Sequence, residues 1–289
     1  MGGGSSTPPR TPTPRPSPCL SQPWRAIPAS SQENLNYIKN FQPRNKEVKH
    51  LRILLHGPVG AGKSSFVNSA ESALRGRVTN RALTDATSGS SFTLKYKTYK
   101  IEKDQQSFYP LVFNDIMGFE KNLDKGVQVE DVKLALEGHV RDGYQFNPDR
   151  PLKESDAGYN KSPSLDDKAH ALVCVIPAGS VSLLEDNVVQ KLRRVRVTAS
   201  ELGIPQMAIL TKVDEACPEV RRNINNIHKS KYLKEQVEKF NVLIGIPINC
   251  IFLVKNYESE IDTDEGINGP ILTALKQMVT HGEDYLNDM

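Results

Sequence analysis

Apolar runs alternate with stretches of helical periodicity along most of the chain. A short apolar run bounded by turn residues predicts a strand that is buried on both faces. Such runs predict strands at 51–56 (LRILLH), 108–115 (FYPLVFND), 169–177 (AHALVCVIP), 206–212 (QMAILTK) and 250–257 (CIFLVKNY). Residues 92–103 (FTLKYKTYKIEK) alternate between apolar and polar, which predicts a half-exposed strand beside 108–115.

The segments between these strands have helical spacing. In GKSSFVNSAESALRG the apolar positions from Phe66 to Leu74 share one face, and Gly76 can end the helix. Other helices are expected in 31–43, 129–144 and about 182–202, in Lys-rich segments to about 240, and in 268–281. Strands that alternate with helices predict an α/β fold with a mostly parallel sheet and helices on both faces.

Composition divides the chain into two regions. Residues 1–30 are rich in Pro, Ser, Thr and Gly, with too few apolar side chains to offset the entropy of ordering. We therefore predict a disordered tail at 1–30 and one domain over 31–289. Within that domain, residues 144–168 form a long polar insertion, either a lid or a loose surface loop.

The overall charge excludes little and favours no polyanionic partner. Lys and Arg total 37 against 34 Asp and Glu, so bulk charge gives no argument for specific nucleic-acid binding. The four cysteines fit no zinc pattern, and no apolar run is long enough for a membrane span. The first residues do not resemble a secretory signal. We expect a cytoplasmic protein with reduced thiols.

The first six residues, MGGGSS, match a lipidation pattern. Gly2 is the acceptor position of N-myristoylation and Ser6 occupies its favoured position, while Cys19 could carry a second lipid. A flexible glycine-rich start explains the same residues and is our default interpretation. Membrane association is therefore expected only if Gly2 is myristoylated.

The strand at 51–56 ends in the motif G-x-x-x-x-G-K-S, followed directly by a helix. Glycines in this context let backbone N–H groups surround a phosphate at the positive end of the helix. The motif therefore predicts a three-layer P-loop NTPase fold. We expect the nucleotide phosphates to be bound by Gly57, Pro58, Val59, Gly60, Ala61, Gly62, Lys63, Ser64 and Ser65.

A magnesium ion should accompany the phosphates. The hydroxyl of Ser64 has the length of a Mg²⁺ ligand, and Asp115 ends a neighbouring strand from which its carboxylate can hold Mg²⁺ through water. The N–H of Gly118, in the same D-x-x-G motif, can reach the γ-phosphate. Thr84 and Thr87 both qualify as a further Mg²⁺ ligand, and we favour Thr87.

The segment Thr211-Lys212-Val213-Asp214 predicts that the nucleotide is GTP or GDP. A carboxylate at Asp214 can accept hydrogen bonds from the N1–H and N2–H₂ groups of guanine, which adenine lacks. Lys212 would lie along the base, and Thr211 stands where guanine-binding motifs commonly have Asn. Asn256, after the last strand, is a further candidate contact to the base.

No catalytic residue is identified for hydrolysis. The position after D-x-x-G is Phe119, where a Gln orients the attacking water in small regulatory GTPases. Phenylalanine cannot do this, so unaided hydrolysis should be slow unless a partner or a second copy supplies a group. Arg81 could act as an arginine finger from within the chain, although nothing in the sequence supports that role.

Several phrases of the chain resemble the interferon-induced protein 44 and 44-like family. They are LRILLHGPVGAGKSSF, YPLVFNDIMGFE, DVKLALEGHV, VCVIPA, GIPQMAILTKVDEACPEV and CIFLVKNY, and the similarity runs from about Pro23 to the end. The resemblance implies a GTPase-like domain, a cytoplasmic location, induction by interferon and a role in antiviral or antiproliferative response. It does not by itself imply GTP hydrolysis. Longer members carry an extra domain ahead of this one, whose functions do not transfer.

Three functions are compatible with these residues. The first is a GTP-binding switch or scaffold with slow or assembly-dependent hydrolysis. The second is a noncatalytic interaction protein that keeps nucleotide as a structural element, and the third is an ATP-binding P-loop protein. Lys63, Ser64 and Asp115 favour a working Mg²⁺–nucleotide site, and Asp214 favours guanine over adenine.

Overall fold

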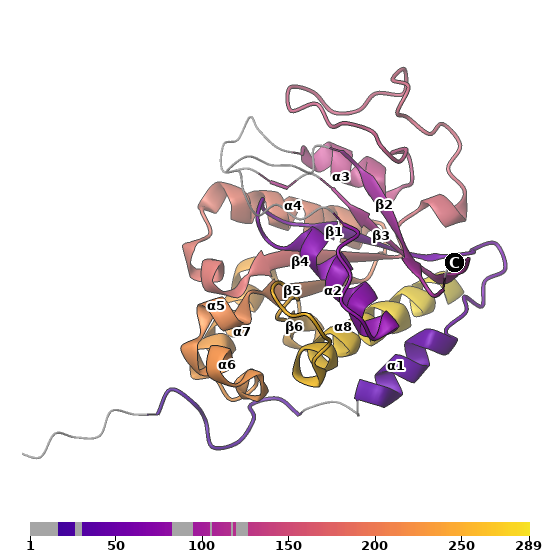
Figure 1. Cartoon of the computed structure of the whole chain (residues 1–289). Coiled ribbons are helices and arrows are strands. Elements are labelled where there is room, and N and C mark those ends of the chain that lie inside the picture. Colours follow the sequence, from indigo (N-terminus) through magenta and orange to yellow (C-terminus); the bar gives the residue numbers. More distant parts are fainter. Residues whose placement is uncertain (1–16, 27–30, 83–94, 105, 117, 120–126) are drawn as a thin grey trace, which may run out of the picture.

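The computed structural model describes residues 17–26, 31–82, 95–104, 106–116, 118–119 and 127–289. A six-stranded sheet with the strand order β2-β3-β1-β4-β5-β6 forms its centre (Figure 1). Strands β3, β1, β4, β5 and β6 are parallel, and β2 runs antiparallel to β3 at one edge. The strands are β1 (Leu51–His56), β2 (Lys97–Glu102), β3 (Phe108–Asp115), β4 (Ala171–Pro177), β5 (Gln206–Thr211) and β6 (Ile251–Leu253).

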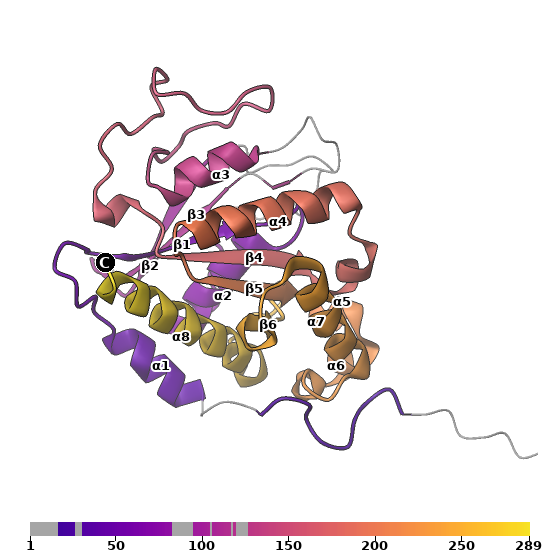
Figure 2. The same ribbon diagram turned by 180° about the vertical axis from the view of Figure 1, so that it is seen from behind.

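Helices cover both faces of the sheet (Figures 1 and 2). One face packs against α2 (Lys63–Arg75) and α8 (Glu265–Asn287), and α1 (Ser31–Asn40) packs on the outer side of α8. The other packs against α3 (Val129–Leu136), α4 (Asp186–Glu201) and α7 (Lys231–Ile244). The short helices are α5 (Val213–Ala216), α6 (Pro218–Arg222) and the 3₁₀ turns η1 (Leu165–Asp167), η2 (Ala178–Leu183), η3 (Ile224–Asn226) and η4 (Ile248–Cys250). The mostly parallel α/β sheet with helices on both faces confirms the predicted fold class.

The uninterrupted apolar runs arise because the central strands are buried on both faces. Leu54 of β1 packs into the core under α3 and α4, whereas Ile53 and Leu55 pack under α2 and α8. Burying each such side chain contributes about 1.5–3 kcal/mol. The sheet is therefore fixed from both sides, and its carboxyl edge can carry functional loops without losing stability.

The helix expected at 129–144 is shorter in the structure. α3 ends at Leu136, and Gly138 then adopts a φ of +85°, a left-handed conformation that ends the helix. Beyond it Val140 pairs with Tyr159 in an isolated antiparallel bridge. The prediction for 137–144 was wrong because a pairing distant in sequence replaces the helical hydrogen bonds.

The insertion at 144–168 packs against α3. The backbone N–H of Leu152 donates to Asp131 of α3 over 2.8 Å, and Arg150 binds Asp156 over 2.7 Å. The rings of His139 and Tyr159 stack with centroids 4.8 Å apart. These contacts attach the segment to α3 and to the residues that follow it.

Residues 17–26 also contact the domain, although they lie within the range expected to be disordered. The N–H groups of Leu20 and Trp24 donate to carbonyls of Lys229 and His228, over 2.8 and 2.9 Å. The guanidinium of Arg25 donates to the carbonyl oxygen of Ile251 in β6 over 2.6 Å, and also to the carbonyl oxygen of Ile248. We call residues 17–26 the N-terminal strap. Gly2 and Ser6 lie outside the described residues.

Candidate nucleotide-binding site

The predicted phosphate loop connects β1 to α2 at the carboxyl edge of the sheet. Gly57 has a φ of +142°, and a Cβ there would lie 2.1 Å from the carbonyl oxygen of Val175 on β4. Gly62 caps α2 with a φ of +88°. Both positions thus require glycine, for close approach and for a left-handed turn respectively. The loop directs the amino terminus of α2 toward the place predicted for the phosphates.

Lys63 is buried beneath this loop. Its Nζ donates to the carbonyls of Gly57 and Pro58, over 3.4 and 3.3 Å. Burial lowers the pKa of Lys63, and the nearby carboxylate of Asp115 opposes that shift. A phosphate would supply this ammonium with a stronger acceptor than two carbonyls.

The two predicted protein contacts to magnesium lie together. Ser64 Oγ donates to Asp115 Oδ2 over 2.6 Å, which joins α2 to the end of β3. Asp115 is fully buried, and its Oδ1 has no hydrogen-bond partner among the described residues. Burial raises the pKa of Asp115, while Lys63 and Ser64 oppose this. A hydroxyl beside a carboxylate with an unpaired buried oxygen fits the oxygen-ligand chemistry of Mg²⁺.

Gly118 and Phe119 lie directly against the phosphate loop. Phe119 donates its N–H to the carbonyl of Gly57 over 3.1 Å and accepts from the N–H of Val59 over 3.3 Å. A Cβ on Gly118 would lie 2.6 Å from the nitrogen of Val59. The ring of Phe119 is 1% exposed and meets the ring of His56 edge-on at 6.0 Å. The side chain at this position is therefore part of the core.

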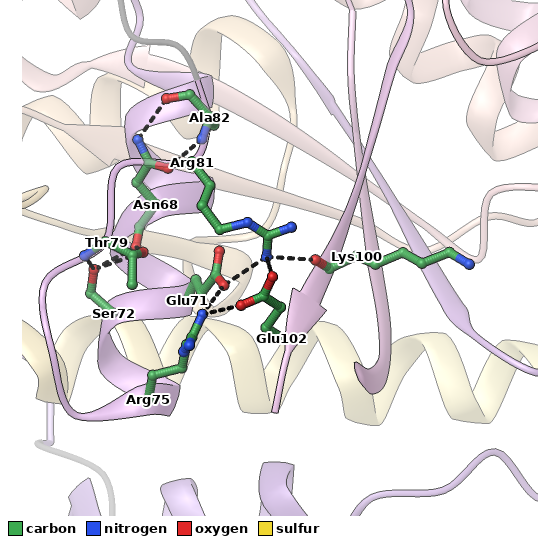
Figure 3. Close-up of polar contacts among 9 residues, drawn as sticks. All are labelled: Asn68, Glu71, Ser72, Arg75, Thr79, Arg81, Ala82, Lys100 and Glu102. Carbon is green, nitrogen blue, oxygen red and sulfur yellow. Dashed lines mark hydrogen bonds and ion pairs between the residues drawn. The ribbon is translucent and has the colours of Figure 1, made fainter. Parts of the chain in front are cut away.

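Thr84 and Thr87, the candidates for a further magnesium ligand, lie outside the described residues. The segment that leads to them is held by α2 (Figure 3). Asn68 of α2 donates to the carbonyl of Ala82 over 2.8 Å and accepts from its N–H over 2.7 Å.

A cluster of charged side chains fixes the same segment (Figure 3). Glu71 binds Arg75 over 3.0 Å and Arg81 over 2.8 Å. Glu102 of β2 contacts both arginines. Arg81 thus forms ion pairs with carboxylates on α2 and β2, which argues against a role as an arginine finger in this conformation.

The predicted base-binding motif adjoins the phosphate loop. Thr211 is fully buried, and its Oγ1 donates to the carbonyl of Ala61 over 2.6 Å. Lys212 has a φ of +55°, and it is the one non-glycine residue with a positive φ in the described part of the chain. Strained conformations of this kind persist where the surroundings hold them and often mark functional sites. Asp214 follows in α5, with its side chain 20% exposed.

Asn256 reaches the phosphate loop as well. Its Nδ2 donates to the carbonyl of Gly62 over 3.3 Å, and its buried Oδ1 has no partner among the described residues. The next residue, Tyr257, donates its N–H to Ser69 of α2 over 3.0 Å. These contacts attach the loop after β6 to the start of α2, and a contact from Asn256 to a base stays a prediction.

The sequence interpretation missed Lys255. Its Nζ lies 3.9 Å from Asp214 Oδ2 and 2.6 Å from Glu260 Oε1. Its position beside Asn256, after the last strand, could have marked it as a candidate site residue.

The structure brings two sets of predicted residues to one edge of the sheet. They are Gly57, Lys63, Ser64, Asp115 and Gly118, predicted for phosphate and metal, and Thr211, Lys212, Asp214 and Asn256, predicted for the base.

Comparison with known proteins identifies relatives over most of the chain. It is 32% identical over 256 residues to interferon-induced protein 44 from Homo sapiens, and 34% identical over 269 residues to interferon-induced protein 44-like from the same organism. The chain is homologous to the interferon-induced protein 44 family. The predicted resemblance is thereby confirmed. Interferon-induced protein 44 from Mus musculus is 31% identical over 266 residues.

The chain spans only part of these family members. The matches cover 88% and 92% of this chain but 57% and 59% of the two human relatives. No protein-family model matches the chain.

Two solved structures are also similar. Toc33 from Arabidopsis thaliana, in complex with GDP and Mg²⁺, aligns with a TM-score of 0.45 and 14% identity over 88% of this chain and 93% of that one. A probable GTP-binding protein engB aligns with a TM-score of 0.43 and 12% identity, over 81% and 98%. In the described part of the chain, no helix is long and apolar enough to cross a membrane.

Proposed function

We propose that this chain binds a guanine nucleotide with Mg²⁺ and acts in the cytoplasm as a nucleotide-dependent switch or scaffold in an innate antiviral response. Homology to interferon-induced proteins supports the proposed antiviral role. The observation that carries nucleotide binding is the pairing of Ser64 with Asp115 over 2.6 Å beside the buried Lys63. If the site had lost its function, we would expect apolar side chains in place of these three residues, because burying charged groups costs free energy.

Different residues would contact the phosphates, the metal ion and the base. Backbone N–H groups between Gly60 and Ser65, with Lys63, would bind the phosphates. Ser64 and Asp115 would hold Mg²⁺, which would neutralise negative charge on the phosphates. Asp214 would accept hydrogen bonds from guanine.

Hydrolysis should be slow in the isolated chain. The position that orients water in small GTPases is occupied by Phe119, whose ring is buried against His56. A partner protein or a second copy of the chain would have to supply the missing group. This supports a switch or scaffold over an enzyme with rapid turnover.

Titration calorimetry with GDP, GTP and ATP in Mg²⁺ tests the binding proposal. We expect GDP and GTP to bind and ATP to bind far more weakly. Lys63→Ala should abolish this binding, whereas the exposed Lys239→Ala on α7 should leave it unchanged. Equal affinity for ATP and GTP would favour the ATP-binding alternative. Nucleotide that co-purifies and does not exchange would favour a noncatalytic interaction protein that keeps nucleotide as a structural element. No binding of any nucleotide, with none co-purifying, would contradict the proposed binding.

The rate of GTP turnover, measured over a series of protein concentrations, tests the proposal that hydrolysis is slow in the isolated chain. A rise in specific activity with concentration would show activation by self-association. Rapid turnover that is independent of concentration would contradict the proposed slow intrinsic hydrolysis.

A further inference from the structure

Lys255 lies between two carboxylates on the base side of the site. Its Nζ is 2.6 Å from Glu260 Oε1 and 3.9 Å from Asp214 Oδ2. The three residues meet because β5 and β6 are parallel neighbours, so the segments that follow them lie at the same edge of the sheet. Each of the three side chains is between 20% and 23% exposed. The cluster is therefore largely buried, and each side chain keeps some surface in contact with solvent.

Glu260 holds Lys255 in place. The other oxygen of Glu260, Oε2, accepts the backbone N–H groups of Glu258 and Ser259, over 2.9 and 3.2 Å. Burial raises the pKa of Glu260, but these hydrogen bonds and Lys255 outweigh it and lower the pKa to about 2. Glu260 therefore stays ionised and fixes the ammonium group.

Lys255 keeps its charge for the same reason. Burial lowers its pKa, but Glu260 and Asp214 outweigh burial and raise the pKa above its usual value. An ammonium group has three N–H donors, and the short contact to Glu260 requires one. Donors thus remain next to the carboxylate that is expected to bind the base.

The chemistry of guanine matches this pair of charges. Its N1–H and N2–H₂ donors suit a carboxylate, and the neighbouring O6 on the same edge is an acceptor. Resting on the proposed guanine binding by Asp214, we propose that Lys255 is a specificity-determining residue that donates a hydrogen bond to O6. Adenine carries an amino group at that position, which would face the ammonium donor to donor. Asp214 and Lys255 together would therefore read three adjacent groups of the ring.

The test compares Mg²⁺–GDP with two analogues by titration calorimetry. In 6-thio-GDP a sulfur, a weaker acceptor, replaces O6, and IDP lacks the 2-amino group. The wild-type chain should bind GDP about tenfold more tightly than 6-thio-GDP, the effect of about one charge-assisted hydrogen bond. Lys255→Met should bring that ratio close to one while leaving the ratio of GDP to IDP affinity unchanged, because Asp214 still contacts the 2-amino group.

Controls separate this proposal from the function on which it rests. Lys234→Met, at an exposed lysine that pairs with Glu238 on α7, should keep both ratios. An unchanged ratio of GDP to 6-thio-GDP affinity in Lys255→Met would overturn the role of Lys255 but not guanine binding. Failure of the wild type to bind GDP would overturn the proposed function itself. The wild-type comparison of GDP with 6-thio-GDP needs no variant, and equal affinities there would also overturn the role of Lys255.

Discussion

The side-chain hydroxyl of Thr211 donates a hydrogen bond of 2.6 Å to the main-chain carbonyl of Ala61. This contact joins the end of β5, where the predicted base-binding segment begins, to the middle of the predicted phosphate loop. Guanine-binding motifs commonly have Asn at this position, and Thr211 keeps a hydroxyl in place of the amide. The structure shows that the hydroxyl makes this bond, while Asn256 adds an amide to Gly62 of the same loop.

Replacing Thr211 by Val tests this connection. Valine has nearly the same shape but leaves the buried carbonyl of Ala61 without its donor, which should cost about 1–3 kcal/mol in the free energy of unfolding. We also expect weaker binding of GDP and GTP alike, because the phosphate loop loses a brace. Urea unfolding and titration calorimetry would measure both effects. Thr211→Ser keeps the hydroxyl and should remain close to the wild type.

Replacing Phe119 by Gln should not produce a fast GTPase. The side chain at 119 is enclosed beside His56, so a Gln there would be buried away from the γ-phosphate rather than aimed at water. Loss of the aromatic packing and burial of an amide should destabilise the fold by about 3 kcal/mol. Single-turnover hydrolysis and urea unfolding are the measurements.

A matched control is Phe108→Gln on β3, whose ring is 47% exposed. It should leave stability nearly unchanged. Faster hydrolysis in Phe119→Gln at wild-type stability would show that the residue can leave the core.

Replacing Glu71 by Gln should loosen the segment around Arg81 and Ala82. Glu71 is 2% exposed and binds Arg75 and Arg81, so losing its charge weakens two hydrogen bonds and should cost about 2 kcal/mol. Glu238→Gln on α7, whose carboxylate pairs with Lys234 four residues away at 3.7 Å, should cost less than about 0.5 kcal/mol. Equal effects on the urea midpoint would contradict the importance of the buried cluster.

Asp131 should make stability depend on pH in mildly acidic solution. Burial raises the pKa of this carboxyl to about 6, against the hydrogen bond from the backbone of Leu152. The folded state then binds the proton more tightly than the unfolded chain, whose Asp has a pKa of about 4. The contribution of Asp131 to stability is therefore full below about pH 4 and is lost as pH rises to about 6.

Asp131→Asn removes this titration and retains an oxygen that can accept from Leu152. Urea midpoints measured between pH 4 and pH 7 should decline less with pH in Asp131→Asn than in the wild type. The exposed Asp149→Asn should retain the wild-type profile. Identical profiles in all three proteins would refute the assignment.

Local signals were sufficient to predict the phosphate loop and the sheet. The motif from Gly57 to Ser64 fixes a turn whose geometry depends on neighbours in sequence, and the apolar runs of β1 and β4 reflect burial on both faces. That Asp115 and Asp214 lie at one edge of the sheet could be predicted from their positions at or just beyond strand ends, because the carboxyl ends of parallel strands meet there.

Contacts between distant segments could not be predicted in the same way. α3 ends at Leu136 because Val140 pairs with Tyr159, a choice that helical periodicity does not reveal. The composition of residues 1–30 predicted disorder on average, yet Trp24 and Arg25 find partners more than two hundred residues away. The ion pairs of Lys255 likewise depend on how two loops fold beside each other.

The N-terminal strap also determines how the chain would respond to mechanical load. Arg25 attaches it to the carbonyl oxygens of Ile248 and Ile251, at the start of the edge strand that precedes Lys255 and Asn256. A pull on the amino-terminal end would therefore reach β6 before it reaches α1. Tension there would be borne next to the loop that carries Lys255 and Asn256, so tethering the chain by that end would be mechanically linked to occupancy of the proposed nucleotide site.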